Sequence, residues 1–261
     1  MSLVTYTVRD HVAEILLDNA PVNALTVPMV DALVQALDRA ASDDSARAVI
    51  VASAVPKRFC AGLDIAALQG ASADTVHTLL DKLYVQLSEA QYRLGKPSIA
   101  AVSGAARGGG MTLAISCDLI VAAGDATFGY PEIDVGMLPA IHFTHLPRIV
   151  GRHVAFDLLF TGRSFSASEA QAFHLVNRVV ATEKVLEEAR SLARNLAAKS
   201  ASAMSIGRAA FHRAADHDYR RGVSYAVDTF CRVAATDDAR EGITAFVEKR
   251  RPNWSQVSRG R

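Results

Sequence analysis

Three uninterrupted apolar runs, separated by stretches of helical periodicity, limit most strongly what this chain can fold into. The runs are Ala48–Ala52, Pro97–Val102 and Asp118–Ala123. Strands that are apolar on both faces are typical of a parallel sheet covered on both sides. Their alternation with amphipathic helices predicts a mixed α/β fold.

The flanking segments fit the same architecture. Val4–Val8 and Val12–Leu17 predict a pair of strands joined by a short turn. Thr26 is a predicted N-cap for a helix with an apolar stripe. The spacing of leucines predicts a further helix over residues 74–94.

After Gly151 the pattern becomes almost wholly helical. Capping-box logic predicts helix starts at Ser166–Glu169 and at Asp238–Glu241. The change in pattern predicts an α/β core over residues 1–200 and a helical C-terminal region over residues 201–261.

The charge balance limits the classes of partner. With Lys+Arg at 28 and Asp+Glu at 27, the net charge is +1, which gives no electrostatic reason to expect nucleic acid or an anionic membrane as a partner. The sequence shows neither a spanning apolar segment nor a signal peptide. Its three cysteines lack a paired spacing, so we expect a reduced, cytoplasmic protein without disulfides.

The segment Gly104–Gly110 follows a predicted buried strand and ends in three consecutive glycines. Glycines before a helix let its free first-turn amides approach a ligand, and such amides favour negative charge. A nucleotide phosphate loop does not fit, because no Lys-Ser/Thr pair follows the glycines. Taken alone, this segment is as compatible with a tight structural turn as with a binding loop.

A second loop with small residues, Arg58–Ile65, also follows a buried strand. By itself it reads most simply as an ordinary connection between strand and helix. Two amide-presenting loops together are more informative, since an oxyanion hole needs two convergent hydrogen-bond donors.

Glu132 lies in an apolar neighbourhood, where burial would raise the pKa of its carboxyl toward that of a useful acid or base. The alternative is an ordinary surface or capping glutamate. His142 and His145 are three residues apart, but no third residue has recognisable ligand spacing, so we predict no metal site.

In this order, these stretches resemble the enoyl-CoA hydratase/isomerase (crotonase) superfamily. The resemblance covers nearly the whole chain, on the segments Asn19–Leu25, Phe59–Asp64, Gly108–Gly110 with Cys117–Asp118, Phe128–Glu132, Pro147–Gly151 and Glu241–Arg250. It implies a spiral of ββα units with a helical C-terminal trimerisation region, assembled as a homotrimer or a dimer of trimers. It also implies an acyl-CoA substrate, with coenzyme A as part of that substrate and no separate cofactor.

The resemblance also implies roles for individual residues. The amides of Leu63 and Gly109 match the two oxyanion donors, and Glu132 matches a proton-transfer carboxylate. An enolate that forms next to the thioester would be stabilised by those two donors. Positions that match the coenzyme A channel are Val22, Ala24, Ala61, Phe246 and Lys249.

One departure from the family pattern affects the predicted reaction. Hydratases of the family use two glutamates, and Thr112 stands where the first would be. A hydroxyl can position a group but is a poor general base. A single carboxylate favours double-bond isomerisation; hydration, hydration-coupled cleavage and a non-catalytic CoA-binding scaffold are the alternatives. His142 is a candidate auxiliary acid or specificity residue, and Arg107 has no assigned role.

Overall fold

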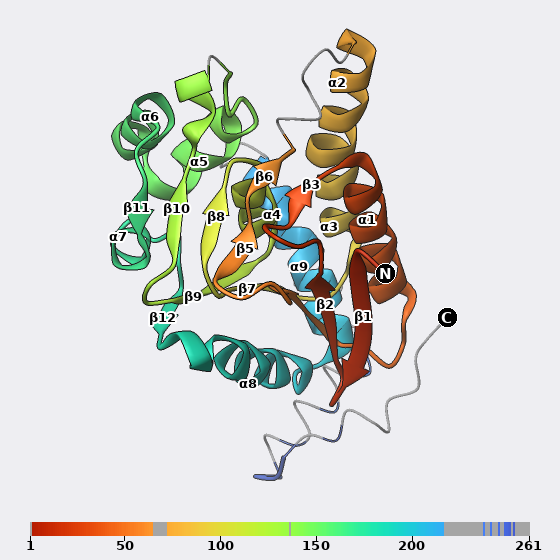
Figure 1. Cartoon of the computed structure of the whole chain (residues 1–261). Helices are drawn as coiled ribbons and strands as arrows, with labels where there is room; N and C mark the ends of the chain where they lie inside the picture. The colour runs from red at the N-terminus through yellow and green to blue at the C-terminus, as the bar shows by residue number, and fades with distance from the viewer. Residues whose placement is uncertain are drawn as a thin grey trace.

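The computed structural model describes residues 2–64, 72–135 and 137–216, together with residues 237, 241, 245, 248–251 and 253. Within these residues the fold is built on two main sheets, and helices pack around them (Figure 1). The predicted mixed α/β fold is confirmed.

The larger sheet has six strands in the order β1-β2-β4-β7-β9-β12. Only β1 and β2 are antiparallel, as predicted for the first strand pair. The strands are β1 (Val4–Arg9), β2 (Val12–Leu17), β4 (Ala48–Ser53), β7 (Ser98–Val102), β9 (Leu119–Ala123) and β12 (Arg178–Val180). All three continuous apolar runs therefore lie side by side at the centre of this sheet, in β4, β7 and β9.

Short strands form the second sheet, in the order β11-β10-β8-β5. They are β5 (Arg58–Cys60), β8 (Ala105–Arg107), β10 (Thr127–Gly129) and β11 (Phe165–Ser166), and a two-stranded ribbon joins β3 (Ala24–Leu25) to β6 (Gly62–Leu63). Each turn of the chain adds one strand to each sheet: β4 then β5, β7 then β8, β9 then β10. This repetition forms the predicted spiral and brings the ends of β5, β8 and β10 together.

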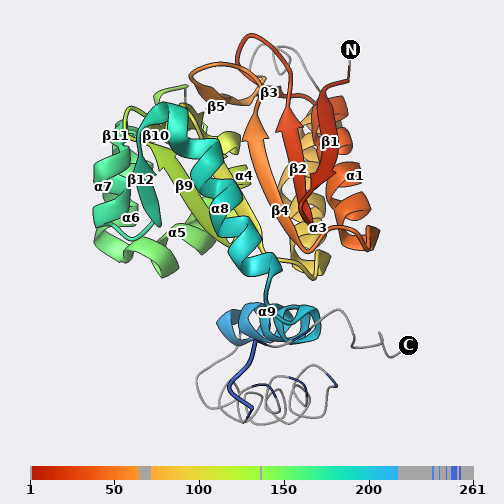
Figure 2. The same cartoon turned by 90° about the horizontal axis from the view of Figure 1, so that it is seen from below.

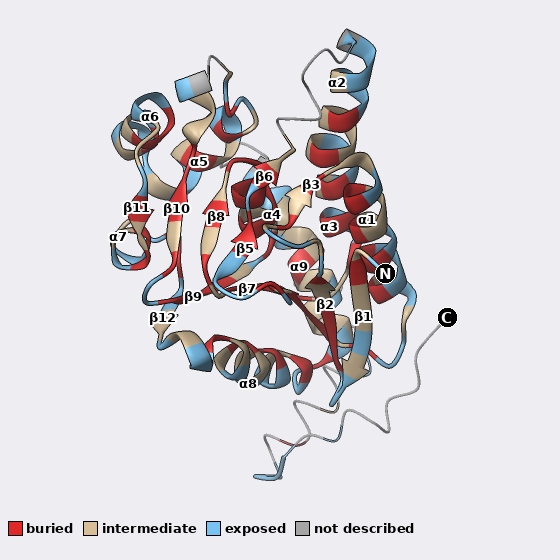
Figure 3. Cartoon of the chain, viewed as in Figure 1, coloured by how far each residue is buried: buried red, intermediate tan, exposed pale blue. Residues whose placement is uncertain are grey.

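The helices pack around these sheets. They are α1 (Val27–Ser42), α2 (Ala73–Leu80), α3 (Leu87–Arg93), α4 (Gly109–Ser116), α5 (His142–Val150), α6 (Arg152–Thr161), α7 (Ala167–Ala172), α8 (Val185–Ala197) and α9 (Ala201–Asp216). Helix α8 lies across the large sheet in Figure 2, and the buried residues gather on the strands and on the inner sides of α1 and α3 (Figure 3).

Two predicted helix caps are confirmed. The side chain of Thr26 accepts a hydrogen bond from the Met29 amide at 3.3 Å. Ser166 and Glu169 form the full capping box of α7. The Asp238–Glu241 cap lies largely outside the described residues.

Other boundaries differ from the sequence expectations. The helix predicted over residues 74–94 contains a π-helical segment, η2 (Asp81–Gln86), between α2 and α3. Its apolar spacing is compatible with either winding, so periodicity alone could not reveal the wider turn. Helix α4 begins at Gly109, inside the run of three glycines that was expected to precede the helix.

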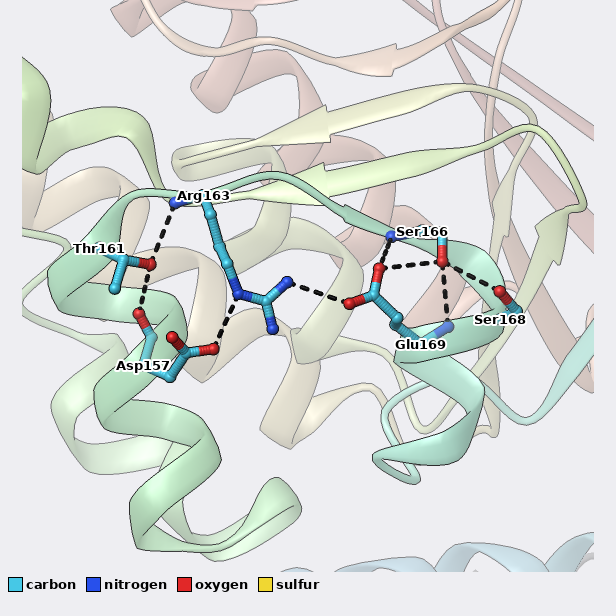
Figure 4. A network of polar contacts seen from close by, with 6 residues as sticks. All are labelled: Asp157, Thr161, Arg163, Ser166, Ser168 and Glu169. Carbon is cyan, nitrogen blue, oxygen red and sulfur yellow. Dashed lines mark hydrogen bonds and ion pairs between the residues drawn. The ribbon is translucent and has the colours of Figure 1, made fainter.

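A polar network fixes the connection from α6 to α7 (Figure 4). Arg163 pairs with Asp157 at 2.8 Å and with Glu169 at 3.0 Å. Beside it, a Cβ on Gly162 would lie only 2.8 Å from Cγ2 of Ile133, in the 3₁₀ turn η3 (Pro131–Val135). The network therefore holds the chain that packs against η3.

Helix α9 lies outside the body of the sheets (Figure 2), and a carboxylate at the start of β9 is one of its anchors, beside the Tyr92 carbonyl of α3, which accepts from Arg208 at 3.3 Å. Asp118 accepts hydrogen bonds from Arg208 at 2.8 Å and from the amide of Ser98 at 2.7 Å. Its other oxygen lies 2.9 Å from Nε2 of His212. Helix α9 begins at the predicted start of the C-terminal region, while the division into 1–200 and 201–261 stays a prediction.

Candidate active site

The two glycine-containing loops approach each other closely. Gly62 has φ +88°, and a Cβ there would lie 2.7 Å from the Arg107 carbonyl oxygen and 2.9 Å from the Gly109 nitrogen. Real side chains do not tolerate such contacts with backbone, so only glycine fits at this position. The strand that carries Leu63 therefore lies directly against the start of α4.

The Gly109 amide is a free hydrogen-bond donor. It is the first residue of α4, and no residue that the structure describes accepts a hydrogen bond from it. Gly108 before it has φ +48° and provides no side-chain cap. The free N–H and the positive end of the helix dipole thus favour negative charge at this point.

The carboxyl group of Glu132 faces the same helix start. A Cβ on Gly108 would lie 2.5 Å from Oε1 of Glu132, so the absence of a side chain at Gly108 makes room for the carboxyl. Its Oε2 is buried without a hydrogen-bond partner among the described residues. Burial raises the pKa of Glu132, against a smaller opposing effect of its own backbone amide. The carboxyl is therefore better matched to proton transfer near neutral pH than an exposed glutamate.

Thr112 and His142 are paired in the interior beside this carboxyl. Oγ1 of Thr112 lies 3.1 Å from Nε2 of His142, and both residues are buried. Burial and, to a smaller extent, His145 lower the pKa of His142 to about 3. His142 is therefore a neutral imidazole at physiological pH, which favours the positioning or specificity role over that of an auxiliary acid.

Tyr130 is a site residue that sequence reasoning missed. It is fully buried, and its ring centroid lies 4.5 Å from that of His142. Its hydroxyl has no hydrogen-bond partner among the described residues. Its place two residues before Glu132 was the available signal, but the contact with His142 depends on how α5 packs.

The residues predicted to line the coenzyme A channel lie partly together. The Ala61 amide donates to the Val22 carbonyl at 3.0 Å, and Ala24 pairs with Gly62. Ala61 is exposed and Val22 is half-buried, so this edge of the ribbon is open to solvent. Of the two C-terminal positions, Lys249 is exposed and Phe246 lies outside the described residues.

Arg107 has a structural explanation. Its guanidinium donates to the Thr127 carbonyl at 2.6 Å and to Oγ1 of Thr127 at 2.8 Å, which ties β8 to β10. Burial, and to a smaller extent Arg58, lower the pKa of Arg107.

Two features of the described residues bear on other classes of protein. In the part of the chain that the structure describes, no cluster of His, Cys, Asp or Glu side chains could hold a metal ion. The helices described there include none long and apolar enough to cross a membrane.

A cavity of about 490 Å³ lies elsewhere, between β9 and α9. It is lined by Asp118, Arg208 and Phe211 among others, and by none of the predicted site residues. It is separate from the cluster around Glu132.

Comparisons with known proteins agree with this geometry. The sequence profile for enoyl-CoA hydratase/isomerase matches residues 7–257. The crotonyl-CoA hydratase of Syntrophomonas wolfei is 37% identical over 235 residues, which cover 89% of each chain.

Solved structures give the same result. An enoyl-CoA hydratase from Mycobacterium smegmatis superposes with a TM-score of 0.91 at 35% identity, over 97% of this chain and 98% of that one. An enoyl-CoA hydratase from Bacillus anthracis superposes with a TM-score of 0.92 at 30% identity, over 97% and 98% of the two chains. With its spiral of paired strands and its facing glycine loops, the chain belongs to the enoyl-CoA hydratase/isomerase family.

Proposed function

We propose that this protein isomerises the double bond of an enoyl-CoA thioester, using Glu132 as the only proton-transfer carboxylate. The observation that carries the proposal is the pairing at the first-glutamate position. Thr112 stands there, hydrogen-bonded to a buried His142. Neither group is a general base near neutral pH comparable to a second carboxylate.

In the proposed mechanism, ionised Glu132 removes a proton from the carbon between the double bond and the thioester. The electron pair moves toward the thioester oxygen and forms a dienolate. Glu132, now protonated, returns the proton to the far carbon of the conjugated system, which completes the shift of the double bond and regenerates the carboxylate. No solvent atom becomes bound to carbon other than by exchange of this proton.

The negative charge that develops on the thioester oxygen requires donors. We assign this role to the amides of Gly109 and Leu63, on the free Gly109 N–H and the close approach of Gly62 to Gly109. A single donor of this kind contributes about 3 kcal/mol of transition-state stabilisation. The open edge at Val22, Ala24 and Ala61 would hold coenzyme A, with Phe246 and Lys249 closing over it.

Hydration is the second candidate function. The relatives quoted above are named hydratases, and Oε2 of Glu132 has no partner within the described residues. A water bound there could be activated by Glu132 alone. Hydration-coupled cleavage would start from the same activated water.

Solvent labelling distinguishes the candidates. We expect purified protein to convert a 3-enoyl-CoA thioester into its 2-enoyl isomer without uptake of ¹⁸O from labelled water. Formation of an ¹⁸O-labelled hydroxyacyl product as the main reaction would establish hydration instead. Tight acyl-CoA binding without turnover on a panel of 2-enoyl and 3-enoyl thioesters would favour the non-catalytic scaffold.

The assembly belongs to the same proposal. We expect a homotrimer or a dimer of trimers, built through the C-terminal helical region, with no cofactor beyond the coenzyme A of the substrate. Sedimentation velocity of the purified protein tests the assembly, and a monomer at micromolar concentration would contradict it.

A further inference from the structure

Three polar atoms, one on the proposed proton-transfer carboxylate and two on neighbouring side chains, have no hydrogen-bond partner within the described residues. They are the Tyr130 hydroxyl, Nδ1 of His142 and Oε2 of Glu132. Only two further atoms of this kind occur among the described residues, on Gln91 and Arg208. Buried polar groups in native proteins are generally satisfied, so a cluster of three indicates a place where a polar guest binds.

The first two groups belong to one compact unit. The Tyr130 and His142 rings are in tilted contact at 4.5 Å, and both side chains are almost completely buried. Nε2 of His142 is occupied by Thr112 at 3.1 Å, which fixes the ring and leaves Nδ1 as its free nitrogen. Thr112 comes from α4, His142 from α5 and Tyr130 from the link between β10 and η3, so three separate segments hold the unit.

The charges of these three residues favour a neutral ligand group over an anionic one. His142 and Tyr130 are neutral, since burial lowers the pKa of the imidazole and raises that of the phenol. Glu132 supplies the one carboxyl of the cluster and its charge raises the pKa of Tyr130 further. An anionic group would be repelled when Glu132 is ionised. A neutral hydroxyl can accept from Tyr130, share a hydrogen bond with Nδ1 of His142 in the direction its tautomer sets, and donate to Glu132.

We infer that Tyr130 and His142, with Thr112 holding the imidazole, form a subsite for a hydroxyl group on the acyl chain, so that the substrate class is hydroxylated acyl-CoA thioesters. This inference rests on the proposed function, because it places the acyl chain beside Glu132. The same hydrogen bonds could be made by a bound water, and the experiment below separates these two sources of the hydroxyl oxygen. In either case Tyr130 and His142 orient a group and transfer no proton.

Equilibrium binding tests the subsite without depending on turnover. The probes are saturated acyl-CoA thioesters of one chain length, either unsubstituted or with a single hydroxyl at the fourth, fifth or sixth carbon. Calorimetry gives the ratio of Kd for the unsubstituted and hydroxylated thioesters. We expect wild-type protein to prefer one hydroxylated probe by about tenfold or more, the effect of one well-made hydrogen bond to a buried group.

Substitutions then show which side chains cause the preference for a hydroxylated thioester. Tyr130→Phe removes only the unpartnered oxygen, and His142→Leu removes the imidazole; each should reduce the ratio toward one. Tyr92→Phe is the matched control, because Tyr92 is a partly exposed tyrosine that contacts His212 on α9 instead. It should keep the wild-type ratio. If His142→Leu does not fold, Tyr130→Phe decides the outcome alone.

Each contrary result has a distinct meaning. Equal affinity of wild type for all probes means that the acyl hydroxyl is not recognised, and overturns the inference while leaving the proposed function intact. A preference that survives in Tyr130→Phe also overturns it. Absence of binding to any thioester would overturn both the inference and the proposed function.

Discussion

Replacement of Gly110 by alanine tests whether the two donor loops must touch. Gly110 lies in the first turn of α4, and a Cβ there would be 2.2 Å from the Cys60 carbonyl oxygen and 2.9 Å from its carbon. Both atoms belong to the backbone of β5 and cannot rotate away. The change therefore has to push the chain that leads into Leu63 away from α4.

The magnitude follows from two opposing effects. Alanine in place of glycine in a helix is favourable by about 0.5–1 kcal/mol. Overpacking of a closely packed interior costs about 1–3 kcal/mol, and we take the upper part of that range because the contact is with backbone. The expected net loss is about 2 kcal/mol of unfolding free energy, or a Tm lower by about 4–8 °C for a chain of this size.

Gly207→Ala provides the matched control. Gly207 is also helical, in α9, but a Cβ there would meet no atom within 4 Å. This variant should be as stable as wild type or more stable by up to about 1 kcal/mol. Thermal unfolding of the two variants and wild type, with enoyl-CoA turnover measured alongside, gives the comparison. A Gly110→Ala protein with wild-type Tm and turnover would refute the claim that this contact holds the two loops in place.

Three further predictions address individual side chains. Glu132→Gln should reduce turnover by about 10²–10⁴-fold. Because burial raises the pKa of Glu132, the wild-type protein should also lose unfolding free energy relative to this variant as pH rises above 4.5. Equal curves of stability against pH for the two proteins would contradict the burial of this carboxyl. Thr112→Val should lower the unfolding free energy by about 1–3 kcal/mol, because it leaves Nε2 of His142 buried without this partner, whereas Thr112→Ser should lower it less. Chemical denaturation compares the two variants, and the reverse order would count against the hydrogen bond. Although burial alone would raise it, the pKa of Asp118 is lowered by His212 and Arg208, so Arg208→Leu should destabilise the docking of α9 by about 3 kcal/mol. Hydrogen exchange should then accelerate in α9 but not in β4, and unchanged protection of α9 would exclude this anchoring role.

Much of the fold could be predicted from the sequence because its signals are local. Continuous apolar runs identified β4, β7 and β9, and the side-chain preferences of Thr26 and Ser166 identified two helix starts. The strands of the second sheet were not predicted. At three residues or fewer, β5, β8, β10 and β11 are too short for their alternation to be recognised.

The residues of the candidate site likewise differ in whether a local sequence signal reveals them. Glu132 and the glycine run could be singled out as candidates by their own chemical character, whereas the choice of the Gly109 and Leu63 amides as donors depended on the resemblance to the family. The contacts of Tyr130 and Thr112 with His142 could not, since they join α4, α5 and the link between β10 and η3 through the packing of the spiral. The role of Arg107 was hidden for the same reason, as its acceptors lie 20 residues further along the chain.

The position of α4 has a mechanical consequence. The first residue of this short helix carries the Gly109 amide. Asp118 follows the C-cap at its other end and binds Arg208 and His212 of α9. Eight residues of helix span about 12 Å, so only that length of helix separates these two points. A displacement of α9 would therefore reach the start of α4 through Asp118, and the same carboxylate would also pass it to β7, where it accepts from the Ser98 amide.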